Sequence, residues 1–420
     1  MRKQALLPSF IPRAKTGALC ATLILASGCG SGSNLTVHAG TGFTAFRSIG
    51  NGSYRTIYKF GQYRGGPYGA GGQFIAIDGI FYGTTAFGGH GFLGNGTVFS
   101  LTPSGEEHDL YKFRNTSSGH NPNQALIAVD RVLYGTTLGG GGGCPQESGC
   151  GTIFAVTRSG RERTLYHFKG GSDGITPSGG LVWLGGKFYG VTSNGGSAGE
   201  CPGSVYGTGC GIVFSVDTSG NESVVYRFRG KRDGAAPNGP LLALGGKLYG
   251  TTGGGGAGGN CDHSCGTLFE VTTSGAEKVL HRFGGGSDGS GPVSGMLDID
   301  GVLYGTTGSD GLTNSGCCGT VFKATTSGAE SPIYLFKGPP DAASPNGRLV
   351  VRDGLIYGTA SGGDTCFYFD SGTIFGVSIA GEEHVAYTFS CKSVNQPTGL
   401  TLFKQTLYGS ASDTIFAFTP

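Results

Sequence analysis

The stretch that decides the fold is residues 124–168, which read QALIAVDRVLYGTTLGGGGGCPQESGCGTIFAVTRSGRERTLYHF. It contains four short apolar segments, separated by Asp130-Arg131, by a glycine-rich loop and by Ser159-Gly160. Such segments between turn residues are typical of β-strands. We name the predicted strands A, B, C and D in chain order. We expect neighbours to be antiparallel, because two-residue turns join A to B and C to D.

The words of this stretch repeat along the chain. A Leu/Phe/Ile-Tyr-Gly word recurs seven times at intervals of 51 to 60 residues, at Tyr82, Tyr134, Tyr189, Tyr249, Tyr304, Tyr357 and Tyr408. A period near fifty with several strands per unit indicates a toroidal array. Strand A is apolar on both faces and is predicted to be innermost and covered on both sides. Strand D alternates aromatic and basic residues and is predicted to be outermost. The fold class is therefore all-β, a seven-bladed β-propeller with four antiparallel strands per blade.

The two ends of the array complement each other. A D-type strand at 55–60 has no A–C set before it, and the last A–C set, at 400–418, has no D strand after it. We predict that the two ends form one blade together, because this pairing removes the exposed edges of an open array. The propeller would then span residues 54–420.

Residues 1–28 have the pattern of a signal peptide of the lipoprotein type. The apolar run 18–26 is preceded by four basic residues, Arg2, Lys3, Arg13 and Lys15. Cys29 follows small residues as in a lipobox, so we predict that it is lipidated and that residues 29–53 form a tether and an N-terminal segment. The protein is then expected to be exported and lipid-anchored in a bacterial cell envelope, at the outer membrane or cell surface. The alternative is an ordinary signal peptide and secretion.

Charge argues against a nucleic-acid partner. The whole chain has 29 basic and 27 acidic residues, and removal of the four basic residues of the leader leaves 25 basic ones. A nucleic-acid-binding protein normally has a basic stripe, and none is visible. We expect a monomer that needs no cofactor and meets the membrane through its N-terminal lipid.

The repeated words resemble a known bacterial family. Leu-Tyr-Gly-Thr-Thr, Gly-Thr-Val/Ile-Phe and Ser-Gly-Ala/Glu-Glu, ending in Tyr-x-Phe, occur in one order over residues 54–420. They resemble the GloVer tandem repeat of the proteins described as choice-of-anchor tandem repeat GloVer-containing proteins. The resemblance implies varied attachment to the cell, with which a lipobox agrees. It implies no established activity and no catalytic residues.

The cysteines after Cys29 gather in the B–C loops and close to them. Their loop positions, in a compartment that favours oxidation, predict the disulfides Cys144–Cys150, Cys201–Cys210, Cys261–Cys265 and Cys366–Cys391. A bond between Cys317 and Cys318 stays open, because adjacent residues fit disulfide geometry poorly. Zinc is the alternative at the Cys261–Cys265 loop, but no second cysteine/histidine pair is near in sequence, so we predict no metal site.

Function is the least determined property. The long B–C loops open on one face, where binding residues usually lie, and the candidate ligand-binding residues there are Glu147, Glu200, Asp262, His263, Asp310 and Asp364. Aspartates also repeat in the D–A connections, as in Ser172-Asp173-Gly174. We interpret them as turn-forming residues, with Ca²⁺ binding as the alternative. No catalytic motif is found. The leading hypothesis is a non-catalytic module that binds a glycan, a peptide or a protein. An exported hydrolase or lyase acting on polysaccharide, or a structural surface protein, is the alternative.

Overall fold

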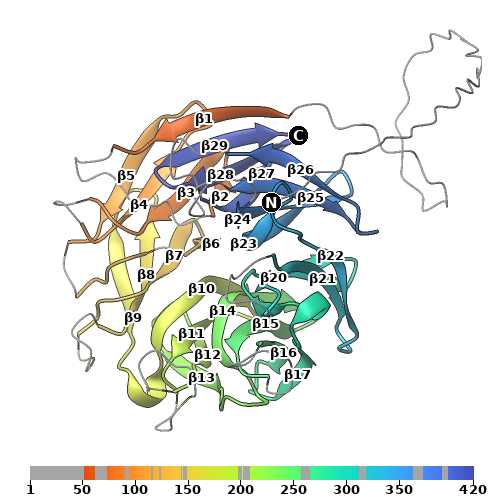
Figure 1. Ribbon diagram of the computed structural model, residues 1–420. Helices are drawn as coiled ribbons and strands as arrows, with labels where there is room; N and C mark the ends of the chain where they lie inside the picture. The colour runs from red at the N-terminus through yellow and green to blue at the C-terminus, as the bar shows by residue number, and fades with distance from the viewer. Residues whose placement is uncertain are drawn as a thin grey trace, which may run out of the picture. The chain divides into compact units, whose positions relative to one another are not determined.

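The computed structural model describes residues 52–61, 73–89, 94–114, 117–122, 124–142, 144, 149–196, 201, 209–256, 265–311, 318–362, 372–389 and 396–420. These residues form seven antiparallel sheets that follow one another around a common axis (Figure 1). The prediction of an all-β, seven-bladed propeller is confirmed.

Six blades follow in chain order. Blade 1 contains β2 (Ile75–Ile77), β3 (Ile80–Thr85), β4 (Thr97–Leu101) and β5 (Glu107–Lys112). Blade 2 contains β6 (Ile127–Val129), β7 (Val132–Thr137), β8 (Thr152–Thr157) and β9 (Glu162–His167). Blade 3 contains β10 (Ile175–Leu184), β11 (Lys187–Asn194), β12 (Ile212–Val216) and β13 (Glu222–Arg227). Blade 4 contains β14 (Ala235–Leu244), β15 (Lys247–Gly254), β16 (Thr267–Thr272) and β17 (Glu277–Arg282). Blade 5 contains β18 (Ser290–Pro292), β19 (Leu297–Ile299), β20 (Val302–Ser309), β21 (Thr320–Thr325) and β22 (Glu330–Leu335). Blade 6 contains β23 (Ala343–Arg352), β24 (Leu355–Gly362), β25 (Thr373–Ser378) and β26 (Glu383–Thr388).

The seventh blade is made from both ends of the described chain. It contains β27 (Pro397–Phe403), β28 (Thr406–Ala411), β29 (Thr414–Thr419) and β1 (Ser53–Lys59). Strand β1 pairs antiparallel with β29, with Ser53 opposite Thr419 and Lys59 opposite Thr414. In every blade the strand order from inside to outside is A, B, C, D. Blade 5 has its inner strand in two pieces, β18 and β19. Two short 3-10 helices, η1 (Gly171–Asp173) and η2 (Gly286–Asp288), lie in D–A connections.

Burial is deepest in the two middle strands of each blade. Nearly every residue of β8 and β12 is buried, whereas Val182 and Trp183 on the inner strand β10 are only partly buried. Strand A is innermost, as expected, and in blade 3 both of its faces are covered, although not completely. Trp183 packs against a cluster that contains Tyr134 and Phe188, and Val182 packs against another that contains Leu241 and Leu248.

The glycine of the Tyr-Gly word makes room for an aromatic ring. A Cβ atom at Gly250 would lie 2.7 Å from Cζ of Phe269 and 2.7 Å from Cδ2 of Leu241, closer than van der Waals contact allows. Phe269 ends the Gly-Thr-x-Phe word on the neighbouring strand, where it pairs with Gly250. The two words recur together because the ring of one packs on the backbone of the other.

Threonines connect the same two words by hydrogen bonds. Thr252 Oγ1 and Thr267 Oγ1 are 2.9 Å apart, and the backbone N–H of Thr267 donates to Thr252 Oγ1 at 3.0 Å. The same pair of contacts joins Thr137 to Thr152. Such cross-strand pairs satisfy buried hydroxyls and fix the register of strands B and C.

The Tyr-x-Phe word joins one blade to the next. The phenylalanine after each outer strand packs edge-on against the Phe of strand C in the following blade, with ring centroids 4.9 to 5.6 Å apart. The series includes Phe389 with Phe416 and Phe60 with Phe99, so it extends from blade 6 to blade 7 and from blade 7 to blade 1. Blade 7 and blade 1 are also joined by a hydrogen bond. Thr401 Oγ1 donates to the carbonyl oxygen of Phe74 at 2.7 Å.

Candidate binding site in the central channel

The inner strands of all seven blades surround a cavity of about 280 Å³ on the axis of the ring. Six blades each provide a polar side chain to its lining, namely Gln73, Gln124, Ser178, Asn238, Arg348 and Thr398. Blade 5 provides Val293 and Gly295. These residues lie in the segment that follows the D–A connection, within the first half of strand A or just before it. The cavity is therefore built from one repeated segment of the fold, but its polar residues do not all occupy the same register position.

A β-bulge in the inner strand presents these residues to the channel. The register of β14 against β15 shifts between Asn238 and Leu242, and equivalent shifts occur in β10 and β23. Extra residues in a bulge leave the ladder and turn away from the partner strand. Gly239 lies in this bulge at a φ of +70°, a conformation that favours glycine. A Cβ atom at Gly179 would collide with the backbone of Gly239, so glycine also lets neighbouring inner strands approach closely.

Arg348 carries the one charged side chain among the described residues that line the cavity. No hydrogen bond or ion pair joins its guanidinium to another residue within the described ranges. Burial lowers the pKa of Arg348, because the surroundings of the charge are poorly solvated. An arginine remains protonated nevertheless. The channel therefore contains a cation without a protein counter-ion in the described part of the chain.

Three of the other polar side chains of the lining, Gln124, Ser178 and Asn238, are held in place by hydrogen bonds. The backbone N–H of Gly179 donates to Gln124 Oε1 at 3.0 Å, and Ser178 Oγ donates to the carbonyl of Pro237 at 3.0 Å. Asn238 Oδ1 accepts a hydrogen bond from Thr251 Oγ1 at 3.2 Å. Amides and hydroxyls with fixed orientation can add neutral hydrogen bonds around a bound group. The arginine can supply paired donors to a carboxylate or phosphate.

Arg348 is also unlike its counterparts in the other blades. It lies two residues before the inner-strand residue that pairs with the tyrosine of the Tyr-Gly word. The residues in that register elsewhere are Gln73, Ala125, Gly180, Pro240, Gly295 and Gly399. An alignment of the seven inner strands would have singled out this arginine in the sequence. The residues predicted to bind a ligand lie in the loops, and Arg348 is not among them.

Only one of the six loop residues predicted to bind a ligand is described. Glu147, Glu200, Asp262, His263 and Asp364 lie outside the described residues. Asp310 is partly buried, and its backbone carbonyl accepts a hydrogen bond from the N–H of Gly286 at 2.6 Å. It does not line the cavity.

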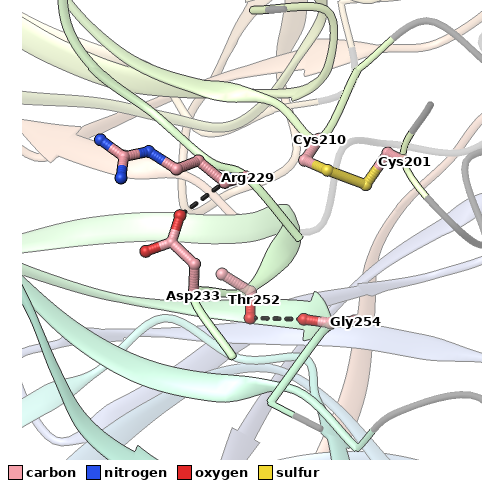
Figure 2. The surroundings of a disulfide bond; sticks show 6 residues. All are labelled: Cys201, Cys210, Arg229, Asp233, Thr252 and Gly254. Atoms are coloured by element: carbon pink, nitrogen blue, oxygen red, sulfur yellow. Dashed lines mark hydrogen bonds between the residues drawn. A yellow bond between two sulfur atoms is a disulfide. The ribbon is translucent and has the colours of Figure 1, made fainter. Parts of the chain in front are cut away.

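Two of the predicted disulfides are present in the described part of the chain. Cys144 is bonded to Cys150 and Cys201 to Cys210, with Cα atoms 5.6 Å and 5.2 Å apart. Figure 2 shows the second bond together with the Asp233 turn. Cys265 and Cys318 are also disulfide-bonded. The remaining cysteines of the predicted pairs and the proposed lipid site lie outside the described residues, namely Cys29, Cys261, Cys317, Cys366 and Cys391. No helix among the described residues is long and apolar enough to cross a membrane.

The aspartates of the D–A connections hold turns and meet acids of the next blade. Asp233 Oδ2 accepts the backbone N–H of Arg229 at 2.8 Å (Figure 2), and Asp233 Oδ1 accepts the hydroxyl of Tyr226 at 2.7 Å. Glu277, the first residue of the next outer strand, lies beside them and accepts Tyr226 Oη at 3.4 Å. We call such a group an outer seam. These contacts are the ones that the turn interpretation of the aspartates requires.

Four outer seams share this arrangement. Their members are Tyr166, Asp173 and Glu222; Tyr226, Asp233 and Glu277; His281, Asp288 and Glu330; and Tyr334, Asp341 and Glu383. Burial, and next the charge of the adjacent aspartate, raises the pKa of the glutamate to about 7 in three seams and to about 8 for Glu330. One oxygen of each glutamate is buried without a hydrogen bond. A proton on one of the two carboxyls would supply the missing donor.

The chain was compared with known proteins. The Gloeobacter/Verrucomicrobia repeat matches residues 28–208 and 201–415. None of the curated proteins compared with the chain matches it. The crystal structure of virginiamycin B lyase from Staphylococcus aureus is similar over 88% of this chain and 99% of the lyase, with 16% identity and a TM-score of 0.57. A catalytically inactive form of that lyase with quinupristin gives the same coverage and identity and a TM-score of 0.58. BamB from Moraxella catarrhalis gives 11% identity and a TM-score of 0.46 over 84% of this chain and 85% of BamB. At such identities the similarity to the lyase shows the fold alone.

Proposed function

The chain belongs to the Gloeobacter/Verrucomicrobia repeat family, and from this premise we propose that it is an exported, non-catalytic binding module whose channel receives an acidic group of a glycan. The observation that carries the proposal is Arg348, a cation in the channel without a counter-ion in the described part of the chain. A buried charge is costly unless it is paired, so a site of this kind gains most from an anion.

The shape and chemistry of the cavity favour a small acidic sugar residue. About 280 Å³ is at the lower end of the range for ligand pockets, enough for one ring with its carboxylate. The lining of amides and hydroxyls provides donors and acceptors for sugar hydroxyls. The described lining residues are groups that bind and orient, since an arginine, two glutamines and an asparagine do not transfer protons at neutral pH.

Export and anchoring are proposed from the sequence, with support from the disulfides. Bonded cysteines such as Cys144–Cys150 persist in oxidising compartments. A signal peptide over residues 1–28 and a lipid on Cys29 would place the propeller in the cell envelope. There it could bind glycans outside the cytoplasm. Metabolic labelling with a palmitate analogue, compared between the wild type and a Cys29→Ser variant, tests the anchor. Label that persists in the variant would contradict it.

The binding proposal can be tested with acidic and neutral sugars. The purified propeller would be titrated with glucuronate, with galacturonate oligomers and with glucose oligomers as neutral controls. We expect binding of the acidic sugars only, and at least a tenfold loss of affinity in Arg348→Met, which keeps the length of the side chain but removes its charge. Equal binding of acidic sugars by wild type and Arg348→Met would contradict the proposal.

The same titration distinguishes the other partners and enzymatic activity. Binding of peptides with a free C-terminal carboxylate, with no response to uronates, would move the assignment from glycan to peptide. Shortening of galacturonate oligomers during the incubation, followed by mass spectrometry, would show an enzyme instead of a binding module.

A further inference from the structure

One outer seam differs from its three counterparts in a single residue. In three seams a tyrosine closes the pair of carboxyls, whereas blade 4 has His281 in that place, at the end of β17. His281 Nε2 lies 2.9 Å and 3.2 Å from the two carboxylate oxygens of Asp288. It lies 3.5 Å from Oε2 of Glu330. The replacement changes a hydroxyl donor into a nitrogen that can bind a metal ion.

The three side chains have the spacing of metal ligands. One donor atom from each residue lies within 4.8 Å of the other two. Around a tetrahedral Zn²⁺ with bonds of about 2.0–2.1 Å, neighbouring donor atoms are about 3.3 Å apart. The observed separations of 2.9 and 3.5 Å from the histidine nitrogen lie on either side of that value. A small shift of side chains would therefore be enough to hold an ion.

Charge and second contacts also fit a divalent cation. A neutral imidazole and two carboxylates together balance two positive charges. Asp288 is oriented by the backbone N–H of Gly284, which donates to its Oδ2 at 2.6 Å, as is usual for carboxylates that bind metals. The side chain of Glu330 is 3% exposed, and its Oε1 is buried without a hydrogen-bond partner. His281 and Asp288 remain about one-quarter exposed, so an ion and its water ligands can reach the site.

We propose that His281, Asp288 and Glu330 form a divalent metal site of the Zn²⁺ type that joins blade 4 to blade 5. The imidazole favours Zn²⁺ over Ca²⁺, which prefers oxygen ligands only. The ion would bridge β17, η2 and the first residue of β22. It would replace the proton that the Asp–Glu pairs share in the other seams. The site is independent of the channel and of the ligand that we propose there.

The neighbouring seams supply matched variants. His281→Tyr gives this seam the residue that the other three contain, so the fold is expected to tolerate it. Tyr226→His places histidine next to Asp233 and Glu277, which reproduces the proposed ligand set in the seam between blades 3 and 4. Glu330→Gln removes one negative charge with little change in shape. All proteins would be oxidised, free of affinity tags and dialysed against chelating resin.

The test is the stoichiometry of Zn²⁺ binding measured by titration calorimetry, with Co²⁺ absorption spectra as a second readout. We expect His281→Tyr to bind one equivalent fewer than wild type and Tyr226→His to bind one more. Glu330→Gln should lose affinity at least tenfold. The melting temperature of the wild type should rise with Zn²⁺, and that of His281→Tyr should rise less.

Zn²⁺ bound by other parts of the chain is the same in every variant, so it cancels when the stoichiometries of the variants are compared. Equal stoichiometry and affinity in wild type and His281→Tyr would overturn the proposal. No Zn²⁺ binding by the wild type would do the same, and the seam would then be a hydrogen-bonded His–Asp pair. If His281→Tyr does not fold, Glu330→Gln and the gain in Tyr226→His still decide between the two outcomes.

Discussion

In the outer seams every acidic group faces a partner, whereas Arg348 in the channel faces no opposite charge among the described residues. Asp233 accepts two hydrogen bonds and lies beside Glu277, whose raised pKa indicates that the pair retains a proton near neutral pH. The seams also repeat the same aspartate and glutamate, with tyrosine in three of the four, while the register of Arg348 holds glutamine, alanine, proline or glycine in the other blades. The seams therefore stabilise the contacts between blades, and the variable inner position is the one that can determine ligand specificity.

This contrast predicts that a seam substitution lowers stability most. Asp233→Ala removes the acceptor of the exposed Arg229 N–H and of the partly buried Tyr226 hydroxyl, which keeps only its longer contact with Glu277. We expect the free energy of unfolding to fall by about 2–3 kcal/mol, measured by urea denaturation. Asp217→Ala, at an exposed C–D turn, is the comparison and should cost less, because water can replace its contacts. Equal losses would remove the special role of the seam.

The shared protons predict an unusual dependence of stability on pH. Burial and the adjacent aspartate raise the pKa of Glu222, Glu277 and Glu383 from 4.5 to about 7. A carboxyl with a higher pKa in the folded state stabilises the fold fully below pH 4.5, and this contribution is lost as the pH rises through 7. We expect the melting temperature to be higher at pH 5 than at pH 8.5, by roughly 2 °C because the groups remain partly exposed to solvent.

The control for the pH effect is the triple variant with glutamine at these three glutamates. Glutamine does not ionise, so the difference in melting temperature between pH 5 and pH 8.5 should shrink. A wild-type melting temperature that rises between these pH values, or a slope unchanged in the triple variant, would show that the seams do not hold the extra protons.

A smaller effect is expected for the tyrosine hydroxyl of a seam. Tyr226→Phe keeps the ring that packs edge-on against Phe228, with centroids 5.2 Å apart, and removes the hydrogen bond to Asp233 and the longer one to Glu277. The free energy of unfolding should fall by about 1 kcal/mol in urea denaturation. A loss as large as that of Asp233→Ala would mean that the hydroxyl, and not the turn, carries the stability of the seam.

The smallest effect on stability is expected in the channel. Arg348→Met removes a partly buried charge that has no counter-ion among the described residues, so the free energy of unfolding should change by less than about 0.5 kcal/mol or increase slightly. The same variant is expected to lose binding of acidic sugars. A destabilised Arg348→Met would show that the arginine is structural, and it would remove the difference between seam and channel.

The architecture was predictable because the residues of the repeated words are those that packing and hydrogen bonding between strands B and C require. Gly250 and Phe269 must occur together for steric reasons, and Thr252 and Thr267 must occur together for hydrogen bonding. Each word therefore fixes a strand, a register and a face. The number of blades follows from counting words, and the family follows from their order.

The channel and the metal seam were not predicted, because each depends on one residue that departs from its repeat. Arg348 lies in a bulge, and strand periodicity does not indicate where bulge residues point. His281 occupies a tyrosine position and looks like any other residue of an outer strand until Asp288 and Glu330 are placed beside it. Both exceptions are visible in an alignment of the repeats, but only the structure shows which residues surround them.

The pairing of β1 with β29 has a consequence for how the protein is made. In chain order β1 is the first strand of the ring and its neighbour β29 is the last, so the edge of β1 that faces β29 stays unpaired until β29 has been synthesised. A protein cut short before β29 would expose the edges of both β1 and β28, which invites aggregation. Only chains that include β29 can therefore cover both edges and close the ring.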